Sequence, residues 1–212
     1  MQSYQHNSTR QLVHRAYLIV GAILVTSGVL TGLLRGGQFN TILLRYFTYL
    51  SNIALILAFV FLAVYYHHKY RHYVSFGATI AIVVTGLVYN LLLVTINGDP
   101  WILSDYTNFV IHFASMIWAI CNYLIFEDKG KINIRHMLIG MLFPFVYWMI
   151  FIVVGYVSVD RWSPYFFMDT VKYNFFVLIL WLLALLVAFV IIGSLVLWYD
   201  HSKATKSTDN NV

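Results

Sequence analysis

Residues 175–199 read FFVLILWLLALLVAFVIIGSLVLWY, and this stretch decides the fold class. It contains no charged residue, and about 20 apolar residues in a helix are enough to cross the roughly 30 Å of hydrocarbon in a bilayer. Apolar blocks of similar length, separated by short polar stretches, fill the rest of the chain. We therefore expect an all-α, polytopic membrane protein with six transmembrane helices in one bundle. The expected helices span residues 12–34, 41–66, 73–96, 109–126, 137–159 and 175–199.

The composition argues against a water-soluble fold. Hydrophobic residues make up 61% of the chain and charged residues only 10%, whereas a soluble domain carries about 25% charged residues. The formal net charge is +5, but Lys and Arg lie in short loops beside the apolar blocks and not along one helical face. Such positions are typical of topology signals and anionic lipid contacts, so we expect no nucleic-acid partner. Cys121 is the single cysteine, so no disulfide forms within the chain.

The basic residues also predict the orientation. Six crossings place an N-terminal tail, residues 1–11, and a flexible C-terminal tail, residues 200–212, on the same side. If that side is the cytoplasm, nine basic residues lie inside and four outside. The inner ones are Arg10, Arg15, Lys69, Arg71, Lys129, Lys131, Arg135, Lys203 and Lys206, and the outer ones are Arg35, Arg45, Arg161 and Lys172. Because cytoplasmic loops are enriched in Lys and Arg, we expect a cell-membrane protein with both termini cytoplasmic.

Tyrosine and tryptophan gather near the expected helix ends, where amphipathic rings prefer the level of the lipid headgroups. We interpret these residues as membrane anchors. They include Tyr65, Tyr66, Trp101, Tyr106, Trp162, Tyr165 and Trp198. Pro144 lies within the fifth expected helix, where it removes one backbone hydrogen bond and is expected to bend the helix.

Polar side chains recur at helical spacing inside the apolar blocks, where they are costly and are therefore candidates for function. The second helix carries Arg45, Thr48 and Asn52, the fourth carries Asn108, His112 and Ser115, and the third carries Asn90 near its end. Spacings of three and four residues place each set on one helical face. At 1.5 Å per residue, Thr48, Asn90 and His112 lie about 10, 9 and 6 Å from the outer ends of their helices. The three residues are therefore expected to converge in the outer half of the membrane.

A threonine and a histidine at one depth suit acyl transfer. A hydroxyl is a weak nucleophile until a base takes its proton, and neutral imidazole suits that role. Asn52 or Asn90 could donate to the developing oxyanion, and Arg45 could hold a lipid carboxylate or phosphate. Each residue also has a structural interpretation: the threonine bonding its own helix, the histidine joining helices, and the arginine extending to the headgroups.

Several other chemistries lack their signatures. The sequence has no G-x-S-x-G elbow, no H-E-x-x-H, no phosphate-binding glycine loop and no paired intramembrane carboxylates. The cluster His67, His68, Lys69, Arg71 and His72 is a short loop with no thiolate or carboxylate close in the sequence. We interpret it as a topology signal and not as a metal site. We expect neither a metal nor a cofactor.

Three segments, in chain order, resemble a known family, the six-helix membrane proteins related to androgen-induced gene and androgen-dependent TFPI-regulating proteins. Residues 45–49, RYFTY, resemble that family's basic-aromatic-apolar-Thr-aromatic motif on the second helix. Residues 108–112, NFVIH, resemble its N-x-x-x-H motif on the fourth helix. Residues 162–169, WSPYFFMD, resemble its W-x-x-Pro-aromatic stretch ending in an acid.

The resemblance implies a catalytic pair. In the animal members the matching threonine and histidine hydrolyse fatty acid esters of hydroxy fatty acids, so it implies these roles for Thr48 and His112. This chain has Phe109 where the animal members have a second histidine, and its loops look closer to the family's bacterial branch. The expected partner is a membrane lipid or fatty acid ester. Two alternatives remain: a non-catalytic lipid-binding protein or small-molecule carrier, and a scaffold for another membrane protein with no cavity at all.

The expected topology can be tested with a cysteine at Ser104, within the 97–108 segment that carries no Lys or Arg. In a Cys121→Ser background, a membrane-impermeant maleimide added to intact cells should label this position. A cysteine in the 127–136 loop is the matched control and should be protected. Protection at position 104 together with labelling in the 127–136 loop would reverse the orientation.

Overall fold

The computed structural model describes residues 2–99, 101, 103 and 105–209. Within this part of the chain there is no strand, and six helices are long and apolar enough to cross a membrane. The expected all-α polytopic bundle is confirmed. Its spans are α1 (Gln2–Leu33), α2 (Phe47–Val64), α3 (Arg71–Val88) with the π-helix η2 (Tyr89–Asn97), α4 (Tyr106–Phe109) with the π-helix η3 (Val110–Ala114) and α5 (Ser115–Phe126), α6 (Ile134–Val157), and α7 (Phe175–Asp209). Two short 3₁₀ helices, η1 (Thr41–Arg45) and η4 (Phe166–Met168), lie in the connecting loops.

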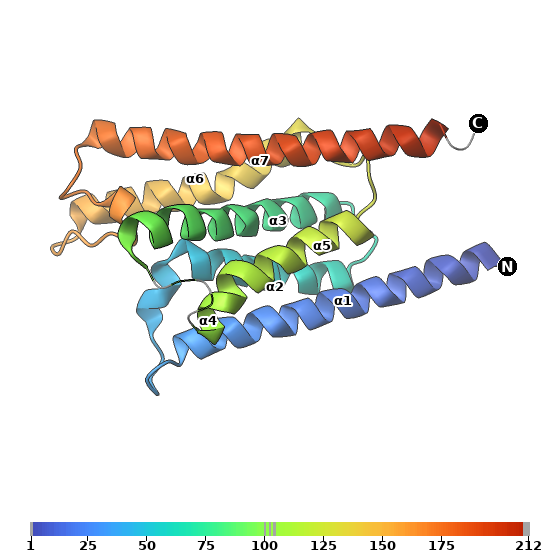
Figure 1. Cartoon of the computed structure of the whole chain (residues 1–212), viewed down its shortest axis with the longest axis horizontal. Helices are drawn as coiled ribbons and strands as arrows, with labels where there is room; N and C mark the ends of the chain where they lie inside the picture. Colours follow the sequence, from blue (N-terminus) through green and yellow to red (C-terminus); the bar gives the residue numbers. More distant parts are fainter. Residues whose placement is uncertain (1, 100, 102, 104, 210–212) are drawn as a thin grey trace.

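Helix α3 occupies the centre of the bundle. It contacts α2, α5, α6 and α7, and α1 packs against α2 and α5 on one side of it. Both ends of the chain lie at the same end of the bundle, as six crossings require (Figure 1). We call this the terminal end, and the opposite one, formed by the 34–46, 98–105 and 158–174 connections, the loop end.

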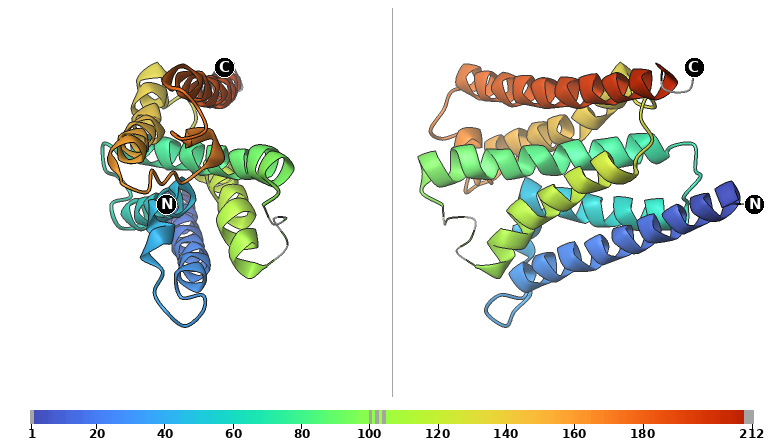
Figure 2. Two further views of the ribbon diagram at one scale, coloured as in Figure 1. Left: turned by 90° about the vertical axis from the view of Figure 1, so that its left-hand side faces the viewer. Right: turned by 45° about the vertical axis from the view of Figure 1, so that its right-hand side comes forward.

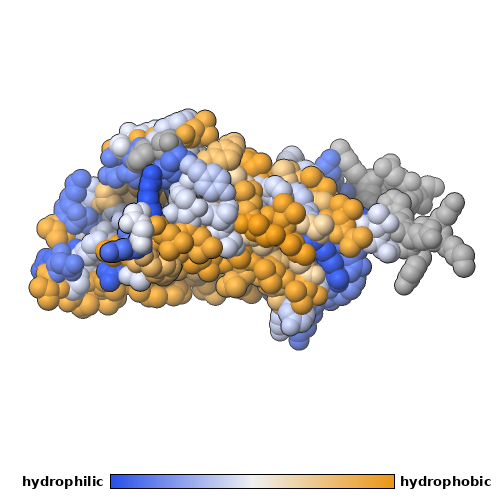
Figure 3. Space-filling model, turned by 90° about the horizontal axis from the view of Figure 1, so that it is seen from below, coloured by the Kyte–Doolittle hydropathy of each residue, from blue (hydrophilic) through white to orange (hydrophobic). Residues whose placement is uncertain are grey.

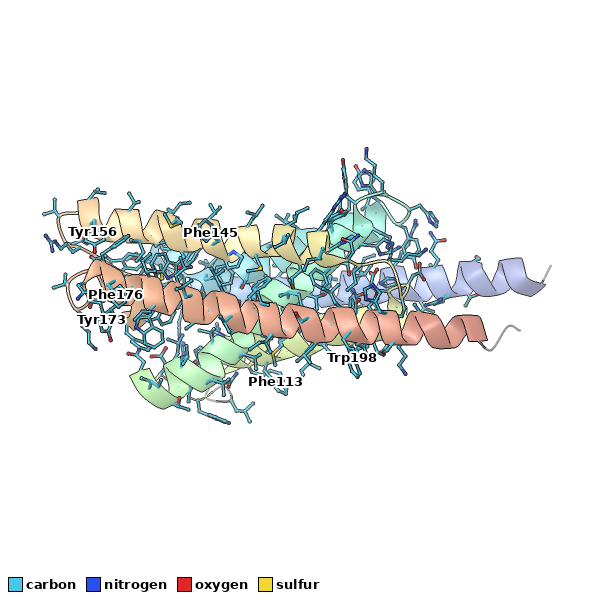
Figure 4. The ribbon with its side chains drawn as sticks, turned by 90° about the horizontal axis from the view of Figure 1, so that it is seen from above. Phe113, Phe145, Tyr156, Tyr173, Phe176 and Trp198 are labelled. Carbon is cyan, nitrogen blue, oxygen red and sulfur yellow. The ribbon has the colours of Figure 1, made fainter. Side chains whose placement is uncertain are left out.

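The outer surface has the character of a membrane protein. Hydrophobic side chains cover the middle of the face shown in Figure 3, and hydrophilic ones gather toward its two ends. The exposed apolar residues include Ile23 and Leu30 on α1 and Leu180 and Leu195 on α7. Figure 4 shows Tyr156, Tyr173 and Phe176 near the loop end and Trp198 toward the terminal end. Trp198 is exposed, as expected of a membrane anchor.

The second span begins later than the sequence predicts. The side chain of Asn40 accepts a hydrogen bond from the Ile42 N–H, which starts η1, and Tyr46 then adopts an extended conformation (φ −84°, ψ 136°). This break separates η1 from α2, which begins at Phe47. Arg45 is therefore not part of the membrane-spanning helix.

Helices α1 and α7 extend into the segments that the sequence analysis treats as tails. Helix α1 starts at Gln2, and α7 continues to Asp209 where a flexible tail is expected from residue 200. Asp200 explains part of the α7 extension. It is fully buried and accepts hydrogen bonds from the Tyr123 hydroxyl (2.8 Å) and the Gly130 N–H (2.7 Å). Ser104 and residues 210–212 lie outside the described residues.

The basic loop at the terminal end has a carboxylate partner that the sequence analysis does not find. Glu127 is buried and accepts a hydrogen bond from Arg71 at 3.0 Å, and His72 lies 3.6 Å from its other oxygen. Burial alone raises the pKa of Glu127, but the contacts with His72 and Arg71 bring it below its ordinary value. The residues are 56 positions apart in the chain, which is why the loop looks isolated in the sequence.

Two glycines of α3 offer a test of the packing. A methyl group on Gly86 would lie 2.8 Å from the His112 carbonyl oxygen and 2.6 Å from the Met116 sulfur, whereas one on Gly77 would lie 3.9 Å from Gly140. Gly86→Ala should therefore destabilise the protein by about 1–3 kcal/mol through overpacking. The control Gly77→Ala should be neutral or stabilising, since alanine favours a helix by about 1 kcal/mol. Thermal unfolding in detergent measures both, and equal melting temperatures would contradict this packing.

Candidate active site

Thr48 lies at the start of α2, inside the bundle. The first N–H groups of a helix have no partner within the helix, and Tyr46 provides no side-chain cap here. Two tyrosine hydroxyls accept these N–H groups instead. The Phe47 N–H donates to the Tyr147 hydroxyl at 3.1 Å, and the Thr48 N–H donates to the Tyr165 hydroxyl at 3.3 Å. The Thr48 Oγ1 lies 3.5 Å from the same Tyr165 oxygen. The capping of α2 therefore places a phenol beside the candidate nucleophile.

His112 lies on the opposite side of the site, in the π-helix η3. It is buried, and its ring stacks on that of Tyr89, the first residue of the π-helix η2, with centroids 3.5 Å apart. Its Nδ1 has no hydrogen-bond partner among the described residues. Turns of π-helix are rare and frequently occur at functional sites. Here Tyr89 lies in one π-helix, η2, and His112 lies in the other, η3.

Asn52 joins the two sides. Its Nδ2 donates to the Thr48 carbonyl at 2.8 Å, one turn earlier on α2, and to the Ile111 carbonyl at 2.9 Å in η3. Asn52 is fully buried. One side chain thus fixes the backbone of Thr48 relative to the residue preceding His112.

A cavity of about 490 Å³ lies between these residues at the loop end. Thr48, His112, Asn108 and Tyr165 all line it. We call it the vestibule. Its remaining polar lining comes from Arg35, Asn40, Tyr46, Tyr49, Tyr89, Asn97, Asp99 and Thr107. Thr48 and His112 line this common space, and no direct hydrogen bond joins their side chains among the described residues.

A second, smaller cavity also borders Thr48, on the side of α6 and α7. It holds about 60 Å³ of open space between α2, α3, α6 and α7. We call it the apolar fissure. Its lining includes Val84, Val88, Leu182, Leu185, Leu186 and Phe189. Thr48, Tyr89, Leu93 and Tyr165 line both cavities.

Only part of the polar stripe expected on the fourth helix lines the vestibule. Asn108 and His112 both line the vestibule, but Ser115 is fully buried and donates to the Ile111 carbonyl of its own helix. Asn90 likewise donates to the Gly86 carbonyl at 2.7 Å and does not line the vestibule. The prediction assumes α-helical phase, and η2 and η3 alter that phase at Asn90 and Ser115. Asn52, Asn90 and Ser115 line neither cavity in the described part of the chain, so their expected contact with a substrate stays a prediction.

Arg45 also lies apart from the site. It is exposed, outside both cavity linings, and its guanidinium lies 5.3 Å from the centre of the Trp162 ring. The expected face shared with Thr48 does not exist because α2 begins after Tyr46. The expectation that Arg45 borders the cavity is wrong.

Tyr165 and Tyr89 are site residues that the sequence does not predict. Tyr165 is expected as a membrane anchor but points to Thr48. Burial raises the pKa of Tyr165 to about 12, so the phenol keeps its proton at neutral pH and remains a hydrogen-bond donor. Residues 162–169 form the third motif of the family resemblance, and this is the one signal in the sequence that points to Tyr165.

The fold and the site together define a six-span membrane protein with a buried threonine, histidine and tyrosine around one cavity. Comparisons of the chain with protein-family models, curated proteins and solved structures give no match. Function must therefore be inferred from the site itself and from the short motifs around it.

The bridge that Asn52 makes between helices can be tested with Ser115 as the control. Both side chains donate to the Ile111 carbonyl, but Ser115 does so within its own helix. Asn52→Ala removes a bond between helices and should lower the free energy of unfolding by about 1 kcal/mol or more. Ser115→Ala removes a bond within one helix and should cost less. Titration with a denaturing detergent measures both variants, and a larger loss in Ser115→Ala would contradict the bridge.

Proposed function

We propose that this protein is an intramembrane hydrolase that cleaves a lipid ester with Thr48 as the nucleophile and His112 as the general base. One observation carries the proposal: a buried hydroxyl and a buried imidazole, from different helices, line the same cavity. The motif resemblance around both residues supports the same roles. The apolar fissure that borders Thr48 has the apolar lining that an acyl chain needs.

The reaction proceeds in two steps. The Thr48 Oγ1 attacks the ester carbonyl carbon while imidazole accepts its proton, directly or through one water across the vestibule. The bond between the carbonyl carbon and the alcohol oxygen then breaks, and the alcohol leaves with the proton from His112. Water activated by His112 next attacks the acyl-threonine, releases the fatty acid and restores the Thr48 hydroxyl.

Tyr165 takes the role that sequence analysis gives to Asn52 or Asn90. The two asparagines donate to backbone carbonyls of the bundle, whereas the Tyr165 phenol lies beside the Thr48 Oγ1. A protonated phenol at this position can donate to the oxyanion that forms on the substrate. Tyr89 holds the His112 ring by stacking.

The alternatives differ from this proposal in what they require of the cavity. A pure scaffold needs no cavity, so the vestibule of about 490 Å³ argues against it. A carrier requires a cavity that opens alternately to both sides, and the vestibule is built from residues of the loop end. A non-catalytic lipid-binding protein shares the same cavities, and only activity separates it from the hydrolase. With the termini in the cytoplasm, as the basic residues favour, the vestibule faces the outside of the cell membrane.

Activity of the site variants tests the proposal. Thr48→Ala and His112→Ala should each lower kcat/KM by about 100-fold or more, and the double variant should be little worse, because catalytic partners act as one unit. Thr48→Ser should retain turnover since the hydroxyl remains, and Tyr165→Phe should lower kcat more than it raises KM. The assay is hydrolysis of fluorogenic fatty acyl esters by purified protein in liposomes.

Thr95→Ala is the matched control. Thr95 is an exposed threonine in η2 that bonds its own helix at Leu91, and it lines neither cavity. It should retain wild-type activity. Full activity in Thr48→Ala would exclude the mechanism, and binding without hydrolysis of any ester would favour the lipid-binding alternative.

A further inference from the structure

Thr48 lies between two cavities, one almost entirely apolar and the other lined by polar and apolar residues together. The vestibule and the apolar fissure share Thr48, Tyr89, Leu93 and Tyr165 as common walls. An ester bound across Thr48, with its carbonyl carbon at the Oγ1, would place one half in each cavity. The chemistry of the two walls determines which half each accepts.

The fissure fits an aliphatic chain. Leu182, Leu185 and Phe189 lie on one face of α7, and between the first and last of them the helix rises about 10 Å at 1.5 Å per residue. No Asp, Glu, His, Lys or Arg lines this cavity in the described part of the chain. A charged or strongly hydrated group would lose its water here without gaining a partner.

Most polar atoms that border the fissure are already paired within the protein. The Tyr147 hydroxyl donates to the Arg45 carbonyl at 2.9 Å, and the Thr85 hydroxyl donates to the Ala81 carbonyl at 2.9 Å. The Trp148 indole N–H is an exception, with no partner among the described residues. The fissure therefore offers little to a polyol and a continuous apolar wall to a methylene chain.

The vestibule fits a polar group without negative charge, because its lining offers the Asp99 carboxylate and no unpaired lysine or arginine among the described residues. Asn97, Asp99 and Asn108 line it, and Arg35 is the only Lys or Arg among its described lining residues. The Arg35 guanidinium lies 3.0 Å from Asp105, so its charge is already paired. Burial opposes ionisation of Asp105, but the Asn108 N–H and Arg35 lower the pKa of Asp105 below its ordinary value. The Asp105 carboxyl is therefore ionised at neutral pH.

We infer that the substrate is a monoester of one fatty acyl chain with a neutral polyol such as glycerol. The acyl chain occupies the fissure and the polyol occupies the vestibule, so the substrate keeps its tail in hydrocarbon and its head at the membrane surface. This inference rests on the proposed hydrolysis at Thr48. It differs from an ester of a hydroxy fatty acid, whose alcohol half carries a second long chain and a carboxylate into a polar space with no unpaired lysine or arginine among its described lining.

The reaction is a hydrolysis with no other reactant. The bond between the acyl carbon and the polyol oxygen breaks, water supplies the hydroxyl of the released fatty acid, and the polyol leaves with a proton. The free polyol departs through the vestibule, and water enters by the same route. The fatty acid leaves through the fissure toward the bilayer.

Photo-crosslinking tests the placement without depending on catalysis. The Thr48→Ala variant is incubated in liposomes with 1-palmitoylglycerol that carries a diazirine along the acyl chain, and the adducts are located by mass spectrometry. Cross-links on the α6 and α7 walls of the fissure, for example at Leu185 or Phe189, are expected. Cross-links confined to vestibule residues, or to the lipid-facing surface, would overturn the placement.

Kinetics with the active protein test the substrate class. The kcat/KM for 1-palmitoylglycerol should exceed that for the palmitoyl ester of a hydroxystearic acid at least tenfold. Leu186→Trp, in the fissure wall, should lower kcat/KM for the palmitoyl ester at least tenfold more than for a butyryl ester of glycerol. Leu183→Trp, half-exposed on the lipid side of α7 and outside both cavity linings, is the control and should show the wild-type ratio.

The two hypotheses fail in different ways. Hydrolysis that persists in Thr48→Ala removes the proposed function. Hydrolysis that depends on Thr48 but prefers the hydroxystearic ester, or equal chain-length ratios in Leu186→Trp and Leu183→Trp, removes only the inference about the substrate.

Discussion

The start of α2 lies inside the bundle, where its first N–H groups find partners in the protein, and the site depends on which partners these are. Unpaired N–H groups in hydrocarbon cost several kcal/mol each, and the residue before the helix supplies no cap. Tyr147 from α6 and Tyr165 from the following loop accept the first two N–H groups of α2. Because Tyr165 must reach the Thr48 N–H to do so, its phenol also lies beside the Thr48 hydroxyl. A structural requirement of the helix thereby builds one wall of the candidate active site.

The opposite wall depends on close approach between helices. Gly86 on α3 leaves room for the backbone of His112, since a methyl group there would lie 2.8 Å from the His112 carbonyl oxygen. Tyr89 then stacks on the imidazole, and Asn52 links α2 to the Ile111 carbonyl. Small residues at helix contacts and hydrogen bonds between helices are the usual means of association where the hydrophobic effect is weak. In this protein both means act within a few residues of the candidate base.

The sequence predicts the six spans well because their signal, a run of apolar residues, needs no knowledge of neighbours. It also places Thr48 and His112 around one cavity, since depth along a helix depends only on residue count. It fails for Asn90 and Ser115 because facing was inferred from α-helical spacing, and π-helical turns change that spacing. It fails for Arg45 because the extended Tyr46 separates it from α2. Tyr165 is missed for a different reason: composition cannot distinguish a tyrosine at the membrane surface from one that turns inward to cap a helix.

The central claim is that the Thr48 hydroxyl is the nucleophile of a hydrolase. The most direct measurement is labelling of the purified protein in detergent with a hydroxyl-reactive fluorophosphonate, followed by mass spectrometry of the peptides. The account predicts a covalent adduct on Thr48 that is absent from Thr48→Ala and strongly reduced in His112→Ala. Labelling of another residue, undiminished in Thr48→Ala, would contradict it.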